Sequence, residues 1–316
     1  MVPSAPRRIV LLMGPTGSGK SDLAITVAGS LPVEIVSVDS AMVYRGMDIG
    51  TAKPDGALRA RVPHHLIDIR DPAESYSAGD FTRDVVQVVD AIWARGHTPL
   101  LVGGTMLYFH ALTDGIARLP EADAQVRAGI DAEAARAGWT ALHAELARVD
   151  PEAAKRIHVN DPQRIQRALE VYRLTGETIT ELQQSRVSAF ADAHVIEFAI
   201  APLERRDLHT RIRTRFLSML DAGFLAEVRG LYARGDLSAE HPSMRAVGYR
   251  QLWRHLAGSC ELNEATEQAV AATRQLAKRQ FTWLRRRQNA QWLNSMHPET
   301  PAQMIDALSK CGIAGA

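Results

Sequence analysis

The fold is decided by eight residues near the N-terminus, Gly14-Pro15-Thr16-Gly17-Ser18-Gly19-Lys20-Ser21. They match the full pattern G-x-x-x-x-G-K-[ST] of a phosphate-binding loop. The apolar residues 9–13 before them predict a buried strand, and residues 21–25 predict the start of a helix. In that setting, backbone N–H groups, the Lys20 ammonium and the helix N-terminus can hold a diphosphate or triphosphate, and the Ser21 hydroxyl can bind Mg²⁺. The alternative, a glycine-rich turn without a ligand, is disfavoured by these flanks.

Two further strands are predicted, over residues 33–38 and 99–102, with a helix between them over about 77–95. The first strand ends at Asp39 and the second at Gly103-Gly104-Thr105. Strands that alternate with helices predict a parallel sheet covered on both faces. Ligands bind beyond the carboxyl ends of such strands, so the phosphate-binding loop, Asp39 and Thr105 are expected around one crevice.

The sequence changes character after Pro120. Residues 121–148 are rich in Ala, Glu and Arg, and further helices are predicted over 162–175 and 178–184. Residues 195–201 predict a strand that returns to the sheet, and residues 208–293 are mostly helical. We therefore predict an α/β fold with a P-loop NTPase-like parallel sheet. Residues 1–119 form its first part, 120–194 an inserted all-helical domain, and 195–316 the completion of the core with a basic helical part.

Composition bounds the class of protein. The chain has 316 residues and a net charge of +1, with no apolar run of membrane-spanning length and no signal-type segment before residue 9. Cys260 and Cys311 are too few for a disulfide framework or a zinc site. We expect a monomer that resides in the cytoplasm and does not contact membranes.

Two features bear on the chemistry of the crevice. Asp39 can coordinate Mg²⁺, act as a general base, or cap a turn with Ser40. No acidic residue ends the strand at 99–102, whereas enzymes that hydrolyse nucleoside triphosphates usually carry one on the metal-binding strand. This weakens a hydrolase interpretation. The adjacent His64 and His65 point to opposite faces of a strand, which makes them a poor metal pair and favours a structural role.

Basic residues gather near the C-terminus. Residues 274–287 contain six of them and no acidic one, which indicates a face for a polyanion such as the phosphates of a nucleic acid. Leu276 and Trp283 are expected to pack inward, and Phe281 and Trp283 are favoured as core residues over a role in stacking on a base. Weaker basic clusters lie at 163–167 and 245–250.

These segments together resemble the bacterial tRNA dimethylallyltransferase family. The matches, in order along nearly the whole chain, are residues 14–21, 39–54, 63–68, 103–108, 163–167, 245–250 and 278–285. Residues 39–54 are highly specific to the family. One position departs: Met42 stands where many members carry Gln.

The resemblance implies transfer of the dimethylallyl group of dimethylallyl diphosphate to N6 of adenosine 37, beside the anticodon of tRNA. The phosphate-binding loop then holds a diphosphate leaving group with Lys20 and Mg²⁺, assisted by Arg215. Asp39 is the implied general base, Thr105 contacts the acceptor, and the adenine is flipped out of the anticodon loop. The helical insertion is the implied clamp on the anticodon stem-loop.

The resemblance also implies a set of tRNA-contacting positions on several segments: Asp39, Ser40, Ala41, Met42, Thr105, Arg127, Gln163, Arg164, Ile165, Gln166, Arg167, Arg245, Ala246, Val247, Gly248, Tyr249, Arg250, Lys278, Arg279, Gln280, Phe281, Thr282, Trp283, Leu284 and Arg285. Cys260 and Cys311 do not supply the zinc finger of eukaryotic relatives. Three other functions stay open on the residues alone. They are a prenyltransferase acting on free AMP, ADP or ATP, a small-molecule kinase, and a nucleotide-switched RNA-binding protein that does not need Asp39.

Overall fold

The computed structural model describes residues 7–115, 117, 119–184 and 188–314, so the segment before residue 7 lies outside it. The chain divides into two compact units. The first consists of Met1–His110 and Asp192–Ala316, and the second of Ala111–Ala191. The second unit begins nine residues before, and ends three residues before, the helical insertion predicted at 120–194. Each unit is described by itself.

A six-stranded sheet of wholly parallel pairs forms the centre of the first unit, in the order β3-β2-β4-β1-β5-β6. The strands span Arg8–Met13 (β1), Val33–Val38 (β2), His64–His65 (β3), Thr98–Gly103 (β4), His194–Ala201 (β5) and Gln291–Asn294 (β6). The predicted parallel sheet and its strands are confirmed. The strand β6 corrects the expectation that the chain is mostly helical up to residue 293. The sequence did not reveal this strand because it is only four residues long and only Leu293 in it is buried.

Helices cover the sheet as the alternation predicts. The helices α1 (Lys20–Ala28) and α14 (Thr300–Lys310) share one buried cluster with the sheet, to which Leu23 and Met304 contribute. The helix α3 (Ala78–Ala94) packs against β2 and β4 through buried residues outside that cluster. Ser77 and Asp80 form a capping box that begins α3, so the predicted helix over 77–95 is confirmed.

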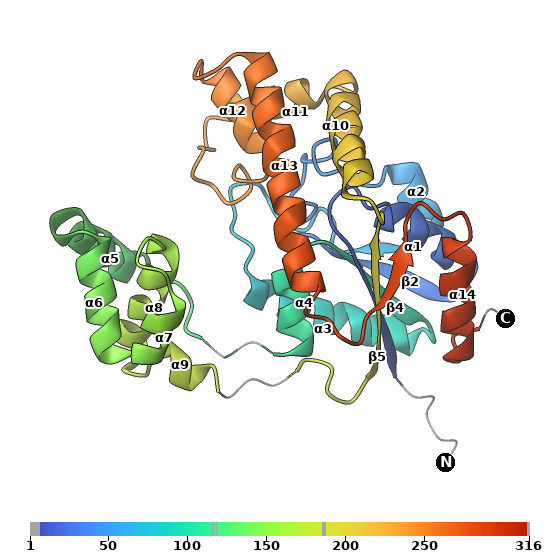
Figure 1. The fold of residues 1–316 in the computed structure, drawn as a ribbon, viewed down its shortest axis with the longest axis horizontal. Coiled ribbons are helices and arrows are strands. Elements are labelled where there is room, and N and C mark those ends of the chain that lie inside the picture. Colours follow the sequence, from blue (N-terminus) through green and yellow to red (C-terminus); the bar gives the residue numbers. More distant parts are fainter. Residues whose placement is uncertain (1–6, 116, 118, 185–187, 315–316) are drawn as a thin grey trace. The chain divides into compact units, whose positions relative to one another are not determined.

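Four helices stand beyond the carboxyl ends of β1 and β5 (Figure 1). They are α10 (Arg205–Asp221), α11 (Phe224–Tyr232), α12 (Tyr249–Leu256) and α13 (Leu262–Leu284), and consecutive members of this set pack on one another, as do α10 and α13. The shorter helices α2 (Gly56–Arg61) and α4 (Met106–Thr113) follow β2 and β4 in the chain. The basic tract 274–287 therefore lies on the last turns of α13 and the three residues after it.

All regular elements that the structure describes in the second unit are helices. It contains α5 (Ala124–Ala137), α6 (Trp139–Val149), α7 (Pro151–Arg156), α8 (Pro162–Thr175) and α9 (Ile179–Leu182). Ile130, Leu146 and Leu169 belong to one buried cluster of its own. The side chains of Asp150 and Asp161 cap α7 and α8, each with Pro in the first turn, which explains why the predicted helix over 162–175 matches α8 residue for residue. Within the described residues, no helix is long and apolar enough to cross a membrane.

Candidate active site

The loops that follow β1, β2 and β4 lie next to one another at the carboxyl end of the sheet, because β4 pairs with both β1 and β2. Gly103 at the end of β4 pairs with Val38 of β2 on one side and Met13 of β1 on the other. A Cβ at Gly103 would lie 2.0 Å from the Val38 carbonyl oxygen, so only glycine allows this approach. Beyond it, the Thr105 N–H donates to the Val38 carbonyl and the Gly14 N–H to the Gly103 carbonyl, both at 3.3 Å. The phosphate-binding loop, Asp39 and Thr105 therefore lie around one crevice, as predicted.

The phosphate-binding loop ends in the left-handed residue Gly19 (φ 87°), which begins α1 without a side-chain cap. No side chain of the residues that the structure describes caps the first N–H groups of α1, so they can bind an anion. The Lys20 Nζ donates to the Pro15 carbonyl at 3.4 Å, and Ser21 lines the cavity in front of the loop. The Ser18 Oγ is buried without a hydrogen-bond partner in the described part of the chain.

The helix α10 packs behind this loop and adds positive charge. Ile212 lies against Gly17, and one turn further Arg215 lines the cavity. Burial and the nearby Arg215 lower the pKa of Lys20 to about 8, while Asp39 opposes this shift. Burial also lowers the pKa of Arg215, again opposed by Asp39. Two partly desolvated cations beside the uncapped first turn of α1 form a site that an anion would stabilise.

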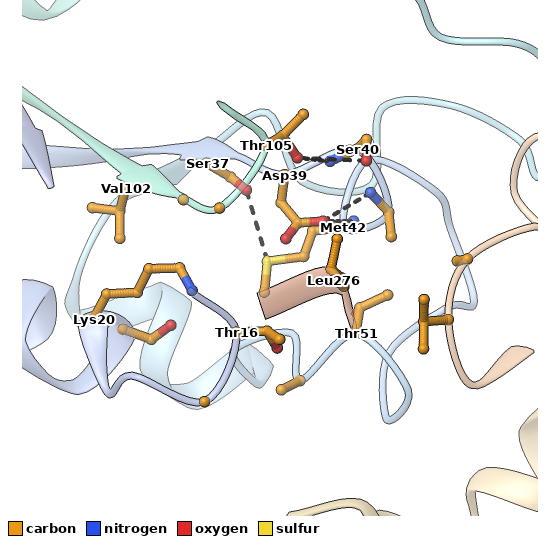
Figure 2. A pocket seen from close by; sticks show the side chains of 18 of the residues that line it. Thr16, Lys20, Ser37, Asp39, Ser40, Met42, Thr51, Val102, Thr105 and Leu276 are labelled. Atoms are coloured by element: carbon orange, nitrogen blue, oxygen red, sulfur yellow. Dashed lines mark hydrogen bonds between the residues drawn. The ribbon is translucent and has the colours of Figure 1, made fainter. Parts of the chain in front are cut away.

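The two carboxylate oxygens of Asp39 differ in their hydrogen bonds. The Oδ1 atom accepts hydrogen bonds from Ala41 N (2.8 Å) and Met42 N (3.2 Å), which closes the turn after β2. The Oδ2 atom accepts none from the described residues. Figure 2 shows the Asp39 carboxylate and the Lys20 amine pointing into the same space. The predicted turn cap is thus real, but it binds Ala41 and Met42 instead of Ser40, and one oxygen remains for chemistry.

Thr105 and Met42 line the same cavity, and Figure 2 shows Thr105 beside Ser40. The Thr105 Oγ1 accepts from Ser40 N at 3.1 Å and is 3.5 Å from Ser40 Oγ. The Ser37 hydroxyl donates to the Met42 Sδ at 3.7 Å, a weak contact because a thioether sulfur is a poor acceptor. The cavity that Thr105 and Met42 line has a volume of about 650 Å³.

The far wall of the cavity comes from α12, α13 and the loop before α12. Ala246, Val247, Leu276, Arg279 and Trp283 line it. The expectation that Leu276 and Trp283 pack into the core is wrong. Trp283 is 38% exposed and both residues line the cavity, because α13 turns Ala277, Gln280 and Leu284 inward instead.

The predicted tRNA-contacting positions fall into two groups. The exposed or partly exposed group has two levels. Its exposed residues are Ser40, Gln163, Arg164, Arg245, Arg250, Lys278, Arg279, Thr282, Trp283 and Arg285, and its half-buried residues are Asp39, Ala41, Met42, Thr105, Arg127, Gln166, Arg167, Ala246, Val247 and Phe281. The other predicted positions, Ile165, Gly248, Tyr249, Gln280 and Leu284, are buried. For these five the structure corrects the expectation: they pack inside the protein and do not reach a partner on the surface.

In the second unit, Glu170 holds two of the predicted arginines. Glu170 is fully buried, and its carboxylate accepts from the Arg127 Nε at 2.8 Å and the Arg167 Nη1 at 2.6 Å. The guanidinium groups lower the pKa of Glu170 against the effect of burial, which raises it. Arg127 thus joins α5 to α8, and Arg167 pairs with Glu170 within α8 and donates to the Pro120 carbonyl at 2.6 Å.

Two clusters were missed by sequence reasoning. The Glu227 carboxylate on α11 accepts from the successive amides of Asp48 (2.9 Å), Ile49 (2.7 Å) and Gly50 (3.2 Å), and from Tyr249 Oη (2.5 Å). It fixes the segment that leads into Thr51, another residue of the cavity wall. A partner 177 residues away leaves no local signal in the sequence.

The second missed cluster surrounds Glu34 of β2. Its carboxylate accepts from Arg95 Nε (2.9 Å), and it lies 2.7 Å from His65 Nε2 and 2.9 Å from His97 Nδ1. The hydrogen bond from Arg95 lowers the pKa of Glu34 to about 2. His64 Nδ1 lies 2.7 Å from the Val62 carbonyl. Both adjacent histidines therefore have structural partners.

Residues 42–287 match the family described as IPP transferase. The chain belongs to this family. It is 60% identical over 281 residues to a tRNA dimethylallyltransferase of Nitrosococcus oceani, an alignment that covers 89% of this chain and 90% of that protein. The crystal structure of the tRNA isopentenylpyrophosphate transferase of Bacillus halodurans is 34% identical, covers 96% of each chain and superposes with a TM-score of 0.69.

A third relative shows the fold alone. The crystal structure of a eukaryotic dimethylallyltransferase acting on tRNA is 24% identical, covers 97% of this chain and 79% of its own, and gives a TM-score of 0.82. The IPP transferase fold thus extends over nearly all of the chain.

Proposed function

We propose that this IPP transferase moves the dimethylallyl group of dimethylallyl diphosphate to N6 of adenosine 37 in tRNA and releases diphosphate. Family membership and the 60% identical tRNA dimethylallyltransferase support the reaction class. The observation that carries the proposal is the cavity itself. A phosphate-binding loop with Lys20 and Arg215 and a free oxygen of Asp39 face the same space, whereas β4 ends in Gly103 and continues with Gly104 and Thr105, without an acid.

The loop side of the cavity suits a diphosphate leaving group. Breaking the allylic C–O bond places negative charge on the departing diphosphate as positive charge develops on the allyl carbon. Lys20, Arg215 and the uncapped N–H groups of α1 lie where they can stabilise that charge as it forms. Binding energy is thereby directed at the transition state.

A divalent cation fits the same place. Ser21 lines the cavity and supplies a hydroxyl, and the described residues contain no cluster of three or more His, Cys, Asp or Glu side chains that could hold a metal by themselves. This donor set suits Mg²⁺, which commonly takes one or two protein ligands and fills its other positions with phosphate oxygens and water. Bound there, Mg²⁺ would neutralise part of the diphosphate charge.

Asp39 is the proposed base. The exocyclic amine of adenine must lose a proton when its nitrogen bonds to carbon, and the Asp39 Oδ2 is the carboxylate oxygen without a hydrogen bond. The turn through Ala41 and Met42 holds the other oxygen and so fixes the orientation of the carboxylate. An adenine inside an anticodon loop reaches such a cavity only when it is flipped out of its stack.

The RNA is proposed to lie on surfaces of both units. Lys278, Arg279 and Arg285 at the end of α13 and Arg245 before α12 are exposed in the first unit, and Arg164 is exposed on α8 of the second. Arginine and lysine contacts to phosphates would position the anticodon stem-loop. We place the reaction in the cytoplasm, with a monomer as the acting form.

A substrate panel tests this function. Purified protein with Mg²⁺ would receive dimethylallyl diphosphate or ATP as donor, and an unmodified anticodon stem-loop or AMP as acceptor. Mass spectrometry should detect a dimethylallyl increment only with the stem-loop and the prenyl donor. A prenylated AMP would move the enzyme to the free-nucleotide class, and consumption of ATP without prenylation would favour a kinase.

A further inference from the structure

Gln280 lies on α13 among residues predicted to contact tRNA, yet its side chain points the other way. It is 7% exposed. Its Oε1 accepts from Thr16 N at 2.9 Å, and its Nε2 donates to the Gly104 carbonyl at 2.8 Å. Both ends of one amide are thus occupied, by partners 264 and 176 residues away in the chain.

The two partners belong to the two loops that meet the reactants. Thr16 lies in the phosphate-binding loop, and Gly104 immediately precedes Thr105, which contacts Ser40 beside Asp39. A backbone N–H that donates to Gln280 is not available to a phosphate, so this bond decides which amides of the loop face the diphosphate.

The fit around the amide is close. A Cβ at Gly104 would lie 2.4 Å from Gln280 Nε2 and 3.2 Å from the Gly14 carbonyl oxygen. Glycine at this position therefore makes room for the amide. The neighbours of Gln280 along α13, Lys278 and Arg279, are exposed, so the helix presents cations outward and this one amide inward.

We infer that Gln280 is a positioning residue for the transfer reaction: it sets the phosphate-binding loop and the Thr105 loop relative to each other and so aligns the diphosphate with the acceptor. The inference rests on the proposed function. A buried amide that only satisfied its own hydrogen bonds would support the fold without affecting the reactants selectively.

The test compares Gln280→Met with two variants on the same helix. Gln275→Met changes an exposed glutamine, and Ala277→Gly lowers stability at a buried position that has no bond to either loop. Three quantities are measured: the Kd for inorganic diphosphate with Mg²⁺, the Kd for the anticodon stem-loop, and the single-turnover rate at saturating substrates. Thermal unfolding gives the stability of each variant.

For Gln280→Met we expect the diphosphate Kd to rise about tenfold and the single-turnover rate to fall about tenfold, with the stem-loop Kd within about twofold, since two hydrogen bonds that shape the site are removed. Gln275→Met should match the wild type, and Ala277→Gly should lose stability but retain diphosphate affinity. Gly104→Ala, whose methyl group displaces the amide, should reproduce the Gln280→Met losses and serves if that variant does not fold.

The inference is overturned if Gln280→Met binds diphosphate and turns over like the wild type, or if Ala277→Gly loses both to the same degree. Failure of the proposed function would look different, because the wild-type protein itself would then transfer no prenyl group.

Discussion

At the scale of single residues, the site depends on how each side chain shares its atoms between structure and chemistry. Asp39 binds its own turn with Oδ1 and leaves Oδ2 free, and Thr105 binds Ser40 N while it lines the cavity. The sequence allowed Asp39 three roles, as a metal ligand, a base or a cap. The structure distinguishes these roles, because Ala41 N and Met42 N both donate to Oδ1 and leave Oδ2 without a hydrogen bond from the described residues.

Asp39→Asn tests the role of that second oxygen. The amide oxygen of Asn can keep the hydrogen bonds from Ala41 N and Met42 N, so the turn should persist, but the group can no longer accept a proton. We expect kcat to fall by about 10²- to 10⁴-fold. Stem-loop affinity, measured by fluorescence anisotropy, should stay within about threefold. Equal losses in affinity and turnover would assign Asp39 to RNA binding.

Lys20 predicts a pH dependence of diphosphate binding. Its pKa is lowered to about 8, so the free protein loses this positive charge as the pH rises through that value. Because only the ammonium attracts the anion, the affinity for inorganic diphosphate should decrease above about pH 8.

The control for this measurement is Lys20→Arg, whose guanidinium stays charged throughout the range. Diphosphate itself titrates at these pH values, so the Kd of the Lys20→Arg variant changes with pH only through the titration of diphosphate. The ratio of the wild-type Kd to the Lys20→Arg Kd, from calorimetry, should rise with pH. A constant ratio between pH 7 and pH 9.5 would contradict the lowered pKa.

At the scale of elements, the sequence predicted those parts that local patterns specify. The run 33–38 is entirely buried and became β2, and Asp161-Pro162 with Gly176 bounds α8 as cap, first turn and C-cap. The inward face of α13 was not predicted. Its buried residues alternate with cations, and Trp283 has a size that favours burial, although the cavity leaves it exposed.

Long-range polar contacts also escaped the sequence. Glu227, Gln280 and Glu34 each hold backbone or side chains from distant segments. Glu227 and Glu34 lie outside the matched motifs, and Gln280 lies in the matched segment 278–285 but was predicted to contact tRNA. The motifs therefore placed the reactive residues around one crevice, while the supporting residues emerged only with the tertiary structure.

The hydrogen bonds that Glu227 accepts from residues 48–50 and Tyr249 lead to a prediction at this scale. Glu227→Gln removes the negative charge and replaces one carboxylate oxygen by an NH₂ group that faces at least one backbone N–H, so at least one charge-assisted hydrogen bond is lost and the others are weakened. We expect the free energy of unfolding, from urea titration, to fall by about 3 kcal/mol. Glu240→Gln, at a side chain 83% exposed, should change it by less than about 0.5 kcal/mol. Similar stabilities for the two variants would remove Glu227 as a support of the cavity wall.

At the scale of the whole molecule, a net charge of +1 leaves little overall attraction for RNA. Binding must then depend on local cations, which are concentrated at the end of α13. The catalytic cavity lies within the first unit, and the second unit has its own core, so the two can contribute separately to substrate binding.

The salt dependence of stem-loop binding measures how many of those local cations contact phosphates. For the double variant Lys278→Ala with Arg285→Ala, we expect weaker stem-loop binding and a slope of log K against log salt that is smaller by about 2, one for each lost phosphate contact. Diphosphate affinity should not change. Lys310→Ala on α14, also an exposed lysine, is the matched control. An unchanged slope would show that RNA binds elsewhere.

The most direct measurement is the mass of adenosine 37 itself. An unmodified anticodon stem-loop would be incubated with dimethylallyl diphosphate, Mg²⁺ and either the wild type or Asp39→Asn, then digested and sequenced by mass spectrometry. We expect one dimethylallyl increment, on adenosine 37 alone, formed rapidly by the wild type and at most slowly by the variant. An increment at another nucleotide, equal rates for the two proteins, or no increment with the wild type would contradict this expectation.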